Sequence, residues 1–287
     1  MVDPWHTNGI AVIGAGVMGV GIAALAVAHG LPVTLVDIDD DKLARAPELV
    51  TSYTRVGMLM GKLPRGGTPG TLTTATTLDA AAPAWAVVEA VTEHAETKAK
   101  VLAELSTVVD PGTLLATNTS AIPVAELAAA TIRPADLLAT HFMNPPYLID
   151  AVEVARGAQT GDAAMARLGE LFELLGRRAI VVGDGPGFVS NHVLMRMIND
   201  AARLVTQGRA EPARIDEVFT ECLGHRTGPL ATADLIGLDN VVDTLAVLFE
   251  RTGEDAYRAD EELVARVRAG RHGRKSGAGF YDYGSTA

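Results

Sequence analysis

Two residues whose types suit proton transfer, His141 and Glu153, lie twelve positions apart near the middle of the chain. His141 ends a run of β-type residues, and Glu153 lies inside the next such run. A histidine that takes a proton near neutral pH works best when a carboxylate holds its second ring nitrogen. The pair therefore offers a general base and the group that orients it, and the reaction it serves depends on the rest of the chain.

A glycine-rich segment near the N-terminus predicts a dinucleotide site. Gly14, Gly16 and Gly19 match the G-x-G-x-x-G fingerprint, and they stand between a short apolar run and an alanine-rich apolar segment. In that context the first glycine makes a tight turn, the second lets the backbone approach a pyrophosphate, and the third lets helix and strand pack closely. We expect the intervening Val17 and Met18 to belong to the same cofactor site.

Asp37 distinguishes between the two nicotinamide cofactors. It ends the second apolar run, eighteen residues after Gly19, where a carboxylate can hold the ribose hydroxyls. An acid at this position repels a 2′-phosphate, and residues 38–40 include no arginine that would accept one. The sequence therefore predicts NAD rather than NADP, although Asp37 alone would also suit the N-cap of the following helix.

Apolar β-type runs alternate with helical patterns along the first two thirds of the chain. The runs lie at 9–13, 31–36, 85–91, 113–117, 137–142, 151–155 and 179–182. Strands that alternate with helices form right-handed crossovers and a mostly parallel sheet, so we predict a Rossmann-type α/β, NAD-binding domain over residues 1–185. From residue 188 to residue 270 the pattern is helical only, in about four segments. It predicts an all-α C-terminal domain over residues 186–287 that serves substrate binding and dimerisation.

Further polar residues follow the ends of predicted elements. Glu93 and Lys98 follow one strand, Ser120 follows the next, and Asn191 opens the helical region. Ligands of open α/β sheets collect at the carboxyl ends of the strands, so these side chains are candidates for the same site. Each also has a plainer interpretation, namely a solvated charge pair for Glu93 and Lys98 and a helix cap for Ser120 or Asn191.

Several longer motifs occur in a fixed order from Gly9 to Tyr283. They are HFMNP (141–145) with AVEV (151–154), NTSAIPVAEL (118–127), PGFVSN (186–191), GPLATADLIGLD (228–239) and GRKSGAGFYDY (273–283). In these motifs the chain resembles the 3-hydroxyacyl-CoA dehydrogenases of the short 3-hydroxybutyryl-CoA type. The resemblance covers nearly the whole chain and is far more specific than the glycine fingerprint.

The resemblance implies a role for each matched residue. His141 would take the proton of an S-configured β-hydroxyl while C3 gives hydride to the nicotinamide, and Glu153 would stabilise the imidazolium that forms. Ser120 and Asn191 would contact the hydroxyl and thioester region of the substrate, and Ser120 would also lie near the nicotinamide. The positions that the family uses around NAD fall on Glu93, Lys98, Asn144 and Lys275.

Four residues depart from the pattern of the family. Tyr53 and Met60 stand about where a serine and a lysine would serve CoA, and no lysine follows Lys42 before Lys62. Tyr147 and Asp150 stand where relatives commonly show a lysine. Because such point charges bind the phosphates of CoA, the departures favour a different acyl group or a different carrier.

The sequence is compatible with three functions. The first is oxidation of a short 3-hydroxyacyl-CoA thioester. The second is the same reaction on a glyceryl-like group tethered to an acyl carrier protein, because homologues of this kind in polyketide biosynthesis resemble the family. The third is a non-catalytic dinucleotide-binding protein, which would be expected to lose His141, Glu153 or Asn191, although all are present. A hydroxyacid dehydrogenase with a lysine base in its helical domain is disfavoured, because no lysine lies between residues 101 and 274.

The composition describes an acidic, well-buried globular protein of 287 residues, with 48% hydrophobic and 21% charged residues. A formal charge of −11 argues against a nucleic-acid surface. The lone Cys222 cannot form an internal disulfide and has no CxxC partner, so we predict no metal site and expect Cys222 to pack within a helix.

Location and assembly follow from two further segments. Residues 1–6 lack the basic and apolar regions of a secretory signal, and no apolar run is long enough to cross a bilayer. We therefore expect a cytoplasmic protein without a membrane partner. Residues 229–249 are apolar over more turns than one packed face needs, which predicts a homodimer through the C-terminal domain.

Overall fold

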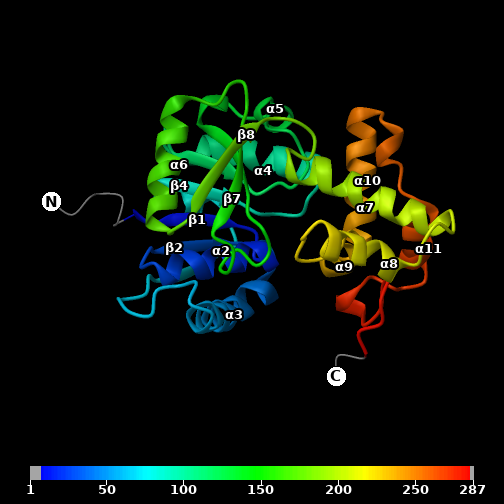
Figure 1. Cartoon of the computed structure of the whole chain (residues 1–287). Helices are drawn as coiled ribbons and strands as arrows, with labels where there is room; N and C mark the ends of the chain where they lie inside the picture. Colours follow the sequence, from blue (N-terminus) through cyan, green and yellow to red (C-terminus); the bar gives the residue numbers. More distant parts are fainter. Residues whose placement is uncertain (1–7, 285–287) are drawn as a thin grey trace. The chain divides into compact units, whose positions relative to one another are not determined.

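The computed structural model describes residues 8–284, and the chain divides into two compact units, Met1–Gly185 and Pro186–Ala287 (Figure 1). Residues 1–6, on which the prediction of no secretory signal rests, lie outside the described residues. Within residues 8–284, no helix combines the length and the apolar character needed to cross a membrane.

In the described part of the first unit, a sheet of eight strands forms the centre, in the order β3-β2-β1-β4-β5-β6-β7-β8. The strands are β1 (Ile10–Ile13), β2 (Val33–Val36), β3 (Leu72–Ala75), β4 (Ala86–Glu89), β5 (Leu114–Thr117), β6 (Leu137–His141), β7 (Ala151–Arg156) and β8 (Arg178–Gly183). All neighbours run parallel except β6 and β7. The predicted Rossmann-type, mostly parallel sheet is confirmed, and its strand order reverses between β1 and β4, where such sheets bind their ligands.

The edge strand β3 was missed by the sequence prediction. Its residues, Leu72-Thr-Thr-Ala, pair only with β2, and Thr73 and Thr74 are exposed. An edge strand has one neighbour and an exposed face, so it does not need the continuous apolar run that marks the central strands.

Helices connect the strands of the first unit. They are α2 (Val17–Ala28), α3 (Asp40–Leu59), α4 (Ala95–Val108), α5 (Val124–Ala128) and α6 (Asp162–Leu174). Helix α2 is buried from Gly19 to its last residue, Ala28, because it packs on β1 and β2 and is also covered by α3. This explains why its sequence is apolar on every face.

The described part of the second unit contains five α-helices around their own apolar core. They are α7 (Ser190–Thr206), α8 (Pro212–Glu217), α9 (Pro229–Ile236), α10 (Leu238–Thr252) and α11 (Glu261–Arg268). The predicted helical region is confirmed, but the expectation of about four segments was too low. Helices α9 and α10 are separated only by Gly237, whose φ of 101° breaks the helix inside a continuous apolar run.

Two buried carboxylates hold the C-terminal segment in the second unit. Asp234 on α9 accepts the backbone N–H groups of Phe280 and Tyr281 at 2.9 and 3.0 Å. Asp216 on α8 accepts the Tyr281 hydroxyl at 2.7 Å and also caps the first turn of α9. The motifs at 228–239 and 273–283 are therefore two halves of one structural contact. The two motifs alone do not reveal this role.

The expectation for Cys222 was wrong. It ends a short π-helical turn, Val218–Cys222, and its side chain is exposed.

Candidate active site

The three fingerprint glycines play distinct structural roles. Gly14 has a φ of 103°, and a Cβ there would lie 2.6 Å from the Ala90 carbonyl oxygen. A Cβ at Gly19 would lie 1.7 Å from the carbonyl oxygen of Gly14, so the fold itself requires glycine at both positions. A Cβ at Gly16 would meet nothing within 4 Å. The open space beside Gly16 is therefore available to a bound group.

Helix α2 starts directly from this turn with its N-terminus available for an anion. Gly16 is the N-cap, Val17 and Met18 begin the helix, and among residues 8–284 no side chain caps it. The first N–H groups of a helix lack partners within the helix, and together with the helix dipole they favour a phosphate. The residues at this turn therefore fit the pyrophosphate of a dinucleotide.

Asp37 lies at the end of β2 beside the same turn. Its Oδ2 accepts the N–H of Ala15 at 2.7 Å and its Oδ1 accepts the N–H of Asp39 at 3.0 Å. The alternative that Asp37 caps the following helix is wrong, because Asp39 is the N-cap of α3. The side chain of Asp39 accepts the backbone N–H groups of residues 41 and 42. The ammonium of Lys42 lies 3.9 Å from Asp37 Oδ2, a neighbour that the sequence analysis did not identify.

Glu93, Lys98 and Ser120 are brought together at the ends of β4 and β5. Lys98 is fully buried, and its Nζ lies 2.9 Å from Glu89 and 3.4 Å from Glu93. Glu93 Oε1 accepts both the N–H and the hydroxyl of Ser120, at 2.7 and 3.1 Å. Because Lys98 is buried, the interpretation of Glu93 and Lys98 as a solvated charge pair is wrong.

The network keeps Glu93 ionised. Burial alone would raise the pKa of Glu93, but the charge of Lys98 and the hydrogen bonds from Thr119 and Ser120 together outweigh it and lower that pKa. An ionised Glu93 can accept all of these hydrogen bonds at once. It therefore fixes the loop that carries Ser120.

Glu89 is a buried acid of this network that the sequence analysis did not identify. It ends β4 and accepts from Lys98, from the Thr117 hydroxyl at 2.6 Å and from the Val91 N–H at 2.8 Å. A charged residue that ends an apolar strand, followed nine positions later by a lysine in a helix, was the available signal.

His141 and Glu153 form the expected pair. They lie opposite each other where β6 and β7 run antiparallel, and His141 Nδ1 is 2.9 Å from Glu153 Oε2. Both residues are buried, at 9% and 8% exposure. A carboxylate only accepts, so Nδ1 carries the proton in this contact and a neutral His141 keeps its lone pair on Nε2. This is the arrangement of a general base with its orienting carboxylate.

Asn118 supports the strand end that carries His141. Its side-chain Oδ1 accepts the backbone N–H of Phe142 at 3.1 Å, and its backbone N–H donates to the carbonyl of Glu89 at 2.6 Å. Asn118 therefore joins the ends of β4, β5 and β6, as a residue that fixes a turn does.

The remaining predicted residues lie in other parts of the chain. Asn144 is exposed in the segment after β6. Asn191 and Lys275 belong to the second unit, where Asn191 is half-buried in the first turn of α7. Lys275 donates to Asp239 Oδ2 at 2.6 Å. Burial raises the pKa of Asp239, but the hydrogen bond from Lys275 and further favourable contacts outweigh burial and leave that pKa lowered.

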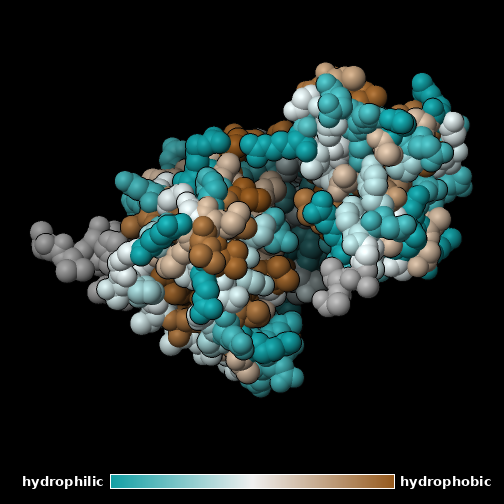
Figure 2. Space-filling view, turned by 60° about the horizontal axis from the view of Figure 1, so that its bottom comes forward, coloured by the Kyte–Doolittle hydropathy of each residue, from teal (hydrophilic) through white to brown (hydrophobic). Residues whose placement is uncertain are grey.

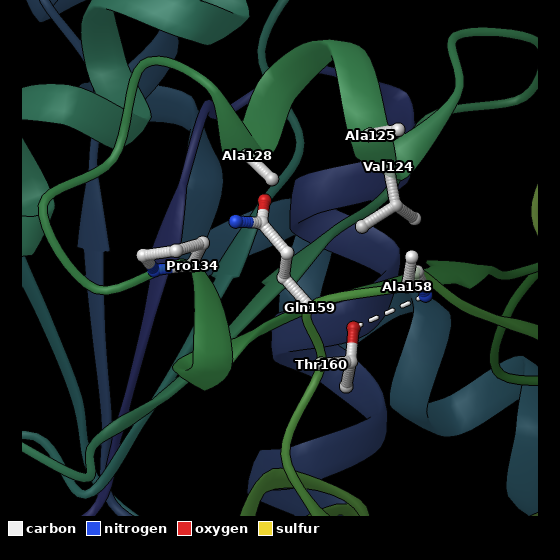
Figure 3. Close-up of a pocket in the computed structure, with 8 residues that line it drawn as sticks. Val124, Ala125, Ala128, Pro134, Ala158, Gln159 and Thr160 are labelled. Atoms are coloured by element: carbon white, nitrogen blue, oxygen red, sulfur yellow. Dashed lines mark hydrogen bonds between the residues drawn. The ribbon is translucent and has the colours of Figure 1, made fainter.

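A small hollow beside α5 is not a ligand site. It lies between α5 and the segment from Gly157 to Thr160, where the Thr160 hydroxyl accepts the Gly157 N–H at 3.1 Å (Figure 3). Its volume of about 20 Å³ has room for about one water molecule.

Two domain families match the sequence. Residues 9–185 match "3-hydroxyacyl-CoA dehydrogenase, NAD binding domain", and residues 187–283 match "3-hydroxyacyl-CoA dehydrogenase, C-terminal domain".

Named relatives match over almost their whole length. The chain is 41% identical to a "Probable 3-hydroxybutyryl-CoA dehydrogenase" of Deinococcus radiodurans, over 95% of this chain and 99% of the relative. It is 36% identical to a 3-hydroxybutyryl-CoA dehydrogenase of Bradyrhizobium diazoefficiens, over 96% and 94%. The crystal structure of (S)-3-hydroxybutyryl-CoA dehydrogenase from Ralstonia eutropha is similar with a TM-score of 0.86 and 35% identity, over 96% of this chain and 99% of that one.

Proposed function

Because the chain belongs to the 3-hydroxyacyl-CoA dehydrogenase family and is thus an NAD-dependent oxidoreductase, we propose that its His141 and Glu153 carry out the proton transfer of that reaction. The substrate we propose is a short 3-hydroxyacyl thioester, which becomes the 3-oxoacyl thioester. The observation that carries this proposal is the buried contact of 2.9 Å between His141 Nδ1 and Glu153 Oε2.

The dyad suits removal of the hydroxyl proton. His141 takes this proton on Nε2, because Nδ1 is held as a donor to Glu153. The carboxylate of Glu153 then stabilises the imidazolium and keeps the ring in one orientation. NAD, when bound, supplies the hydride acceptor at its nicotinamide ring.

The cofactor site rests on the fingerprint turn and Asp37. The open space at Gly16 and the N-terminus of α2 suit the pyrophosphate, and Asp37 suits the ribose hydroxyls. We assign Glu93 and Lys98 to the support of the Ser120 loop, with Ser120 near the nicotinamide and the substrate. We assign Asn191 to the substrate and Asn144 and Lys275 to NAD, as the matched motifs suggest.

For the carrier of the acyl group we propose CoA, because the relatives are named as dehydrogenases of a CoA thioester. One observation favours an acyl carrier protein instead. Lys62, the lysine that follows α3, lies 2.6 Å from Asp150, so an acid offsets its charge, and Met60 is 66% exposed. This region therefore offers CoA phosphates fewer point charges than a lysine-rich helix would.

Assembly as a homodimer through the second unit stays our proposal, together with a cytoplasmic location. Hydrophilic residues cover most of the visible face of this unit, with few apolar residues among them (Figure 2). Three large apolar side chains of this unit are nevertheless more than half exposed, and they are the ones a dimer could cover. They are Leu235 in α9 and Val189 and Val193 at α7. Sedimentation tests the assembly, because a mass equal to one chain at micromolar concentration would refute a dimer.

One assay separates the proposed substrates. Purified protein is given NAD with (S)-3-hydroxybutyryl-CoA and, separately, with a glyceryl group on CoA and on an acyl carrier protein, while NADH is followed. NADH from the CoA thioesters supports CoA as the carrier. NADH from the carrier-linked group alone would show that the substrate is carried by an acyl carrier protein. A protein that binds NAD but forms no NADH with any of them would be a non-catalytic member of the family.

A further inference from the structure

The segment that joins His141 to Glu153 packs against the cofactor-binding helix. Residues 142–150 leave β6 and return to β7, and Pro146 and Tyr147 lie within them. A Cβ at Gly21 of α2 would lie 2.6 Å from Pro146 Cγ and 3.7 Å from Tyr147. Only a glycine permits this approach, so the helix that begins at the fingerprint turn directly supports the segment between the base and its orienter.

Three further contacts hold the same segment. Tyr53 on α3 stacks on Tyr147, with ring centroids 4.9 Å apart and planes at 19°. Arg177, which is buried, donates to the Pro146 carbonyl at 3.3 Å. Lys62 pairs with Asp150 at 2.6 Å. Three of the four residues that depart from the family pattern, Tyr53, Tyr147 and Asp150, are therefore in this one set of contacts.

Burial decides which contact matters most. Lys62 and Asp150 are 42% and 56% exposed, and an ion pair so open to water contributes little. Tyr147 is only 8% exposed, and burial raises the pKa of its hydroxyl. The hydroxyl therefore stays protonated, and Tyr53 stacks on an uncharged ring. Stacked aromatic pairs in such surroundings add a directional attraction to the area they bury.

We propose that Tyr53 is a positioning residue for the His141–Glu153 dyad, acting through its stack on Tyr147. The inference rests on the proposed function, because it assigns Tyr53 to the same reaction. Loss of the stack frees the segment between the two strand ends, and a misplacement of about 1 Å can lower turnover about a hundredfold. The effect should fall on kcat, since the fingerprint turn itself stays intact.

Four variants test this role. Tyr53→Ala removes the stack, Tyr53→Leu keeps apolar volume without a ring, and Tyr53→Phe keeps the ring without the hydroxyl. Leu59→Ala is the control, because Leu59 lies on the same helix and is 72% exposed. We measure kcat, KM for NAD and for the thioester, the melting temperature, and the downfield proton signal of the His141 imidazole, assigned by its loss in His141→Ala.

Tyr53→Ala and Tyr53→Leu should lower kcat by about tenfold to a hundredfold and broaden the imidazole signal, with KM for NAD unchanged. Tyr53→Phe and Leu59→Ala should match the unmodified protein. If Tyr53→Ala fails to fold, Tyr53→Leu decides. A raised KM for the thioester at unchanged kcat, or an equal loss in Tyr53→Phe, overturns the inference. If the unmodified protein forms no NADH, the proposed function fails instead, and the imidazole signal alone then tests whether Tyr53 positions the dyad.

Discussion

Glu153 lies directly opposite His141 in the antiparallel pairing of β7 with β6, and the two side chains meet at 2.9 Å. Facing residues of adjacent strands point to the same side of the sheet, so the register alone brings the imidazole and the carboxylate together. A slip of one residue would turn Glu153 to the other face of the sheet. The proposed catalytic pair is therefore a property of the strand pairing, and among the described strands of this sheet β6 and β7 are the one antiparallel pair.

Asp37 should determine the choice of cofactor. Asp37→Ala removes the acceptor that we propose for the ribose hydroxyls. NAD should then bind about tenfold or more weakly, since a hydrogen bond to a charged group contributes roughly 1.5–3 kcal/mol. The preference for NAD over NADP should also shrink, because Lys42, 3.9 Å from Asp37, would then face a 2′-phosphate without a competing acid. Calorimetric titration with both cofactors measures this, with the exposed Asp40→Ala as the control. Unchanged affinities in Asp37→Ala would exclude the assigned role.

Gly16 and Gly19 should respond differently to alanine. Gly19→Ala places a Cβ against the Gly14 carbonyl and should lower the free energy of unfolding by about 1–3 kcal/mol. Gly16→Ala enters open space at a φ of −75°, so the fold should tolerate it while NAD affinity falls. Urea unfolding and NAD titration of both variants give the comparison. An equal loss of stability in the two variants would contradict the open space at Gly16.

Lys98 should be required for folding as well as for the site. Lys98→Met leaves Glu89 buried without its cation, which should cost about 3–5 kcal/mol in the free energy of unfolding. The double variant Lys98→Met/Glu89→Gln should recover part of this loss, because it also removes the buried charge. Lys100→Met, at an exposed position of the same helix, is the matched control in urea unfolding. A Lys98→Met protein as stable as this control would show that the buried pair contributes nothing.

The lowered pKa of Glu93 predicts how stability depends on pH. A carboxyl group whose pKa is lower in the folded than in the unfolded state stabilises the fold above its unfolded value, here 4.5. That contribution is lost as the pH falls from 4.5 through the lower folded pKa. Glu93→Gln should therefore lose less stability than the unmodified protein over this acidic range, whereas Glu96→Gln, at an exposed position, should follow the unmodified curve. Parallel curves for all three proteins would argue against the Glu93 network.

Much of the fold could be predicted because central strands and α2 carry continuous apolar runs, and the fingerprint glycines stand between them. The edge strand β3 could not, since an edge strand needs no such run. Gly21 and Glu89 were missed for another reason. Gly21 contacts Pro146 and Glu89 contacts Lys98 only after separate segments of the chain have packed together. The local sequence around each residue does not indicate such a contact. The pairing of His141 with Glu153 could be proposed from residue types, but its geometry required the strand register.

Turnover by His141→Ala tests the central claim most directly. The unmodified protein should form NADH from NAD and (S)-3-hydroxybutyryl-CoA, and His141→Ala should lower kcat by about 10²–10⁴ while its affinity for NAD is unchanged. His94→Ala is the control, because His94 is an exposed histidine whose ring Nδ1 lies 3.3 Å from the Thr97 hydroxyl. If His141→Ala turns over the thioester as fast as His94→Ala does, His141 is not the base and this account of the site is wrong.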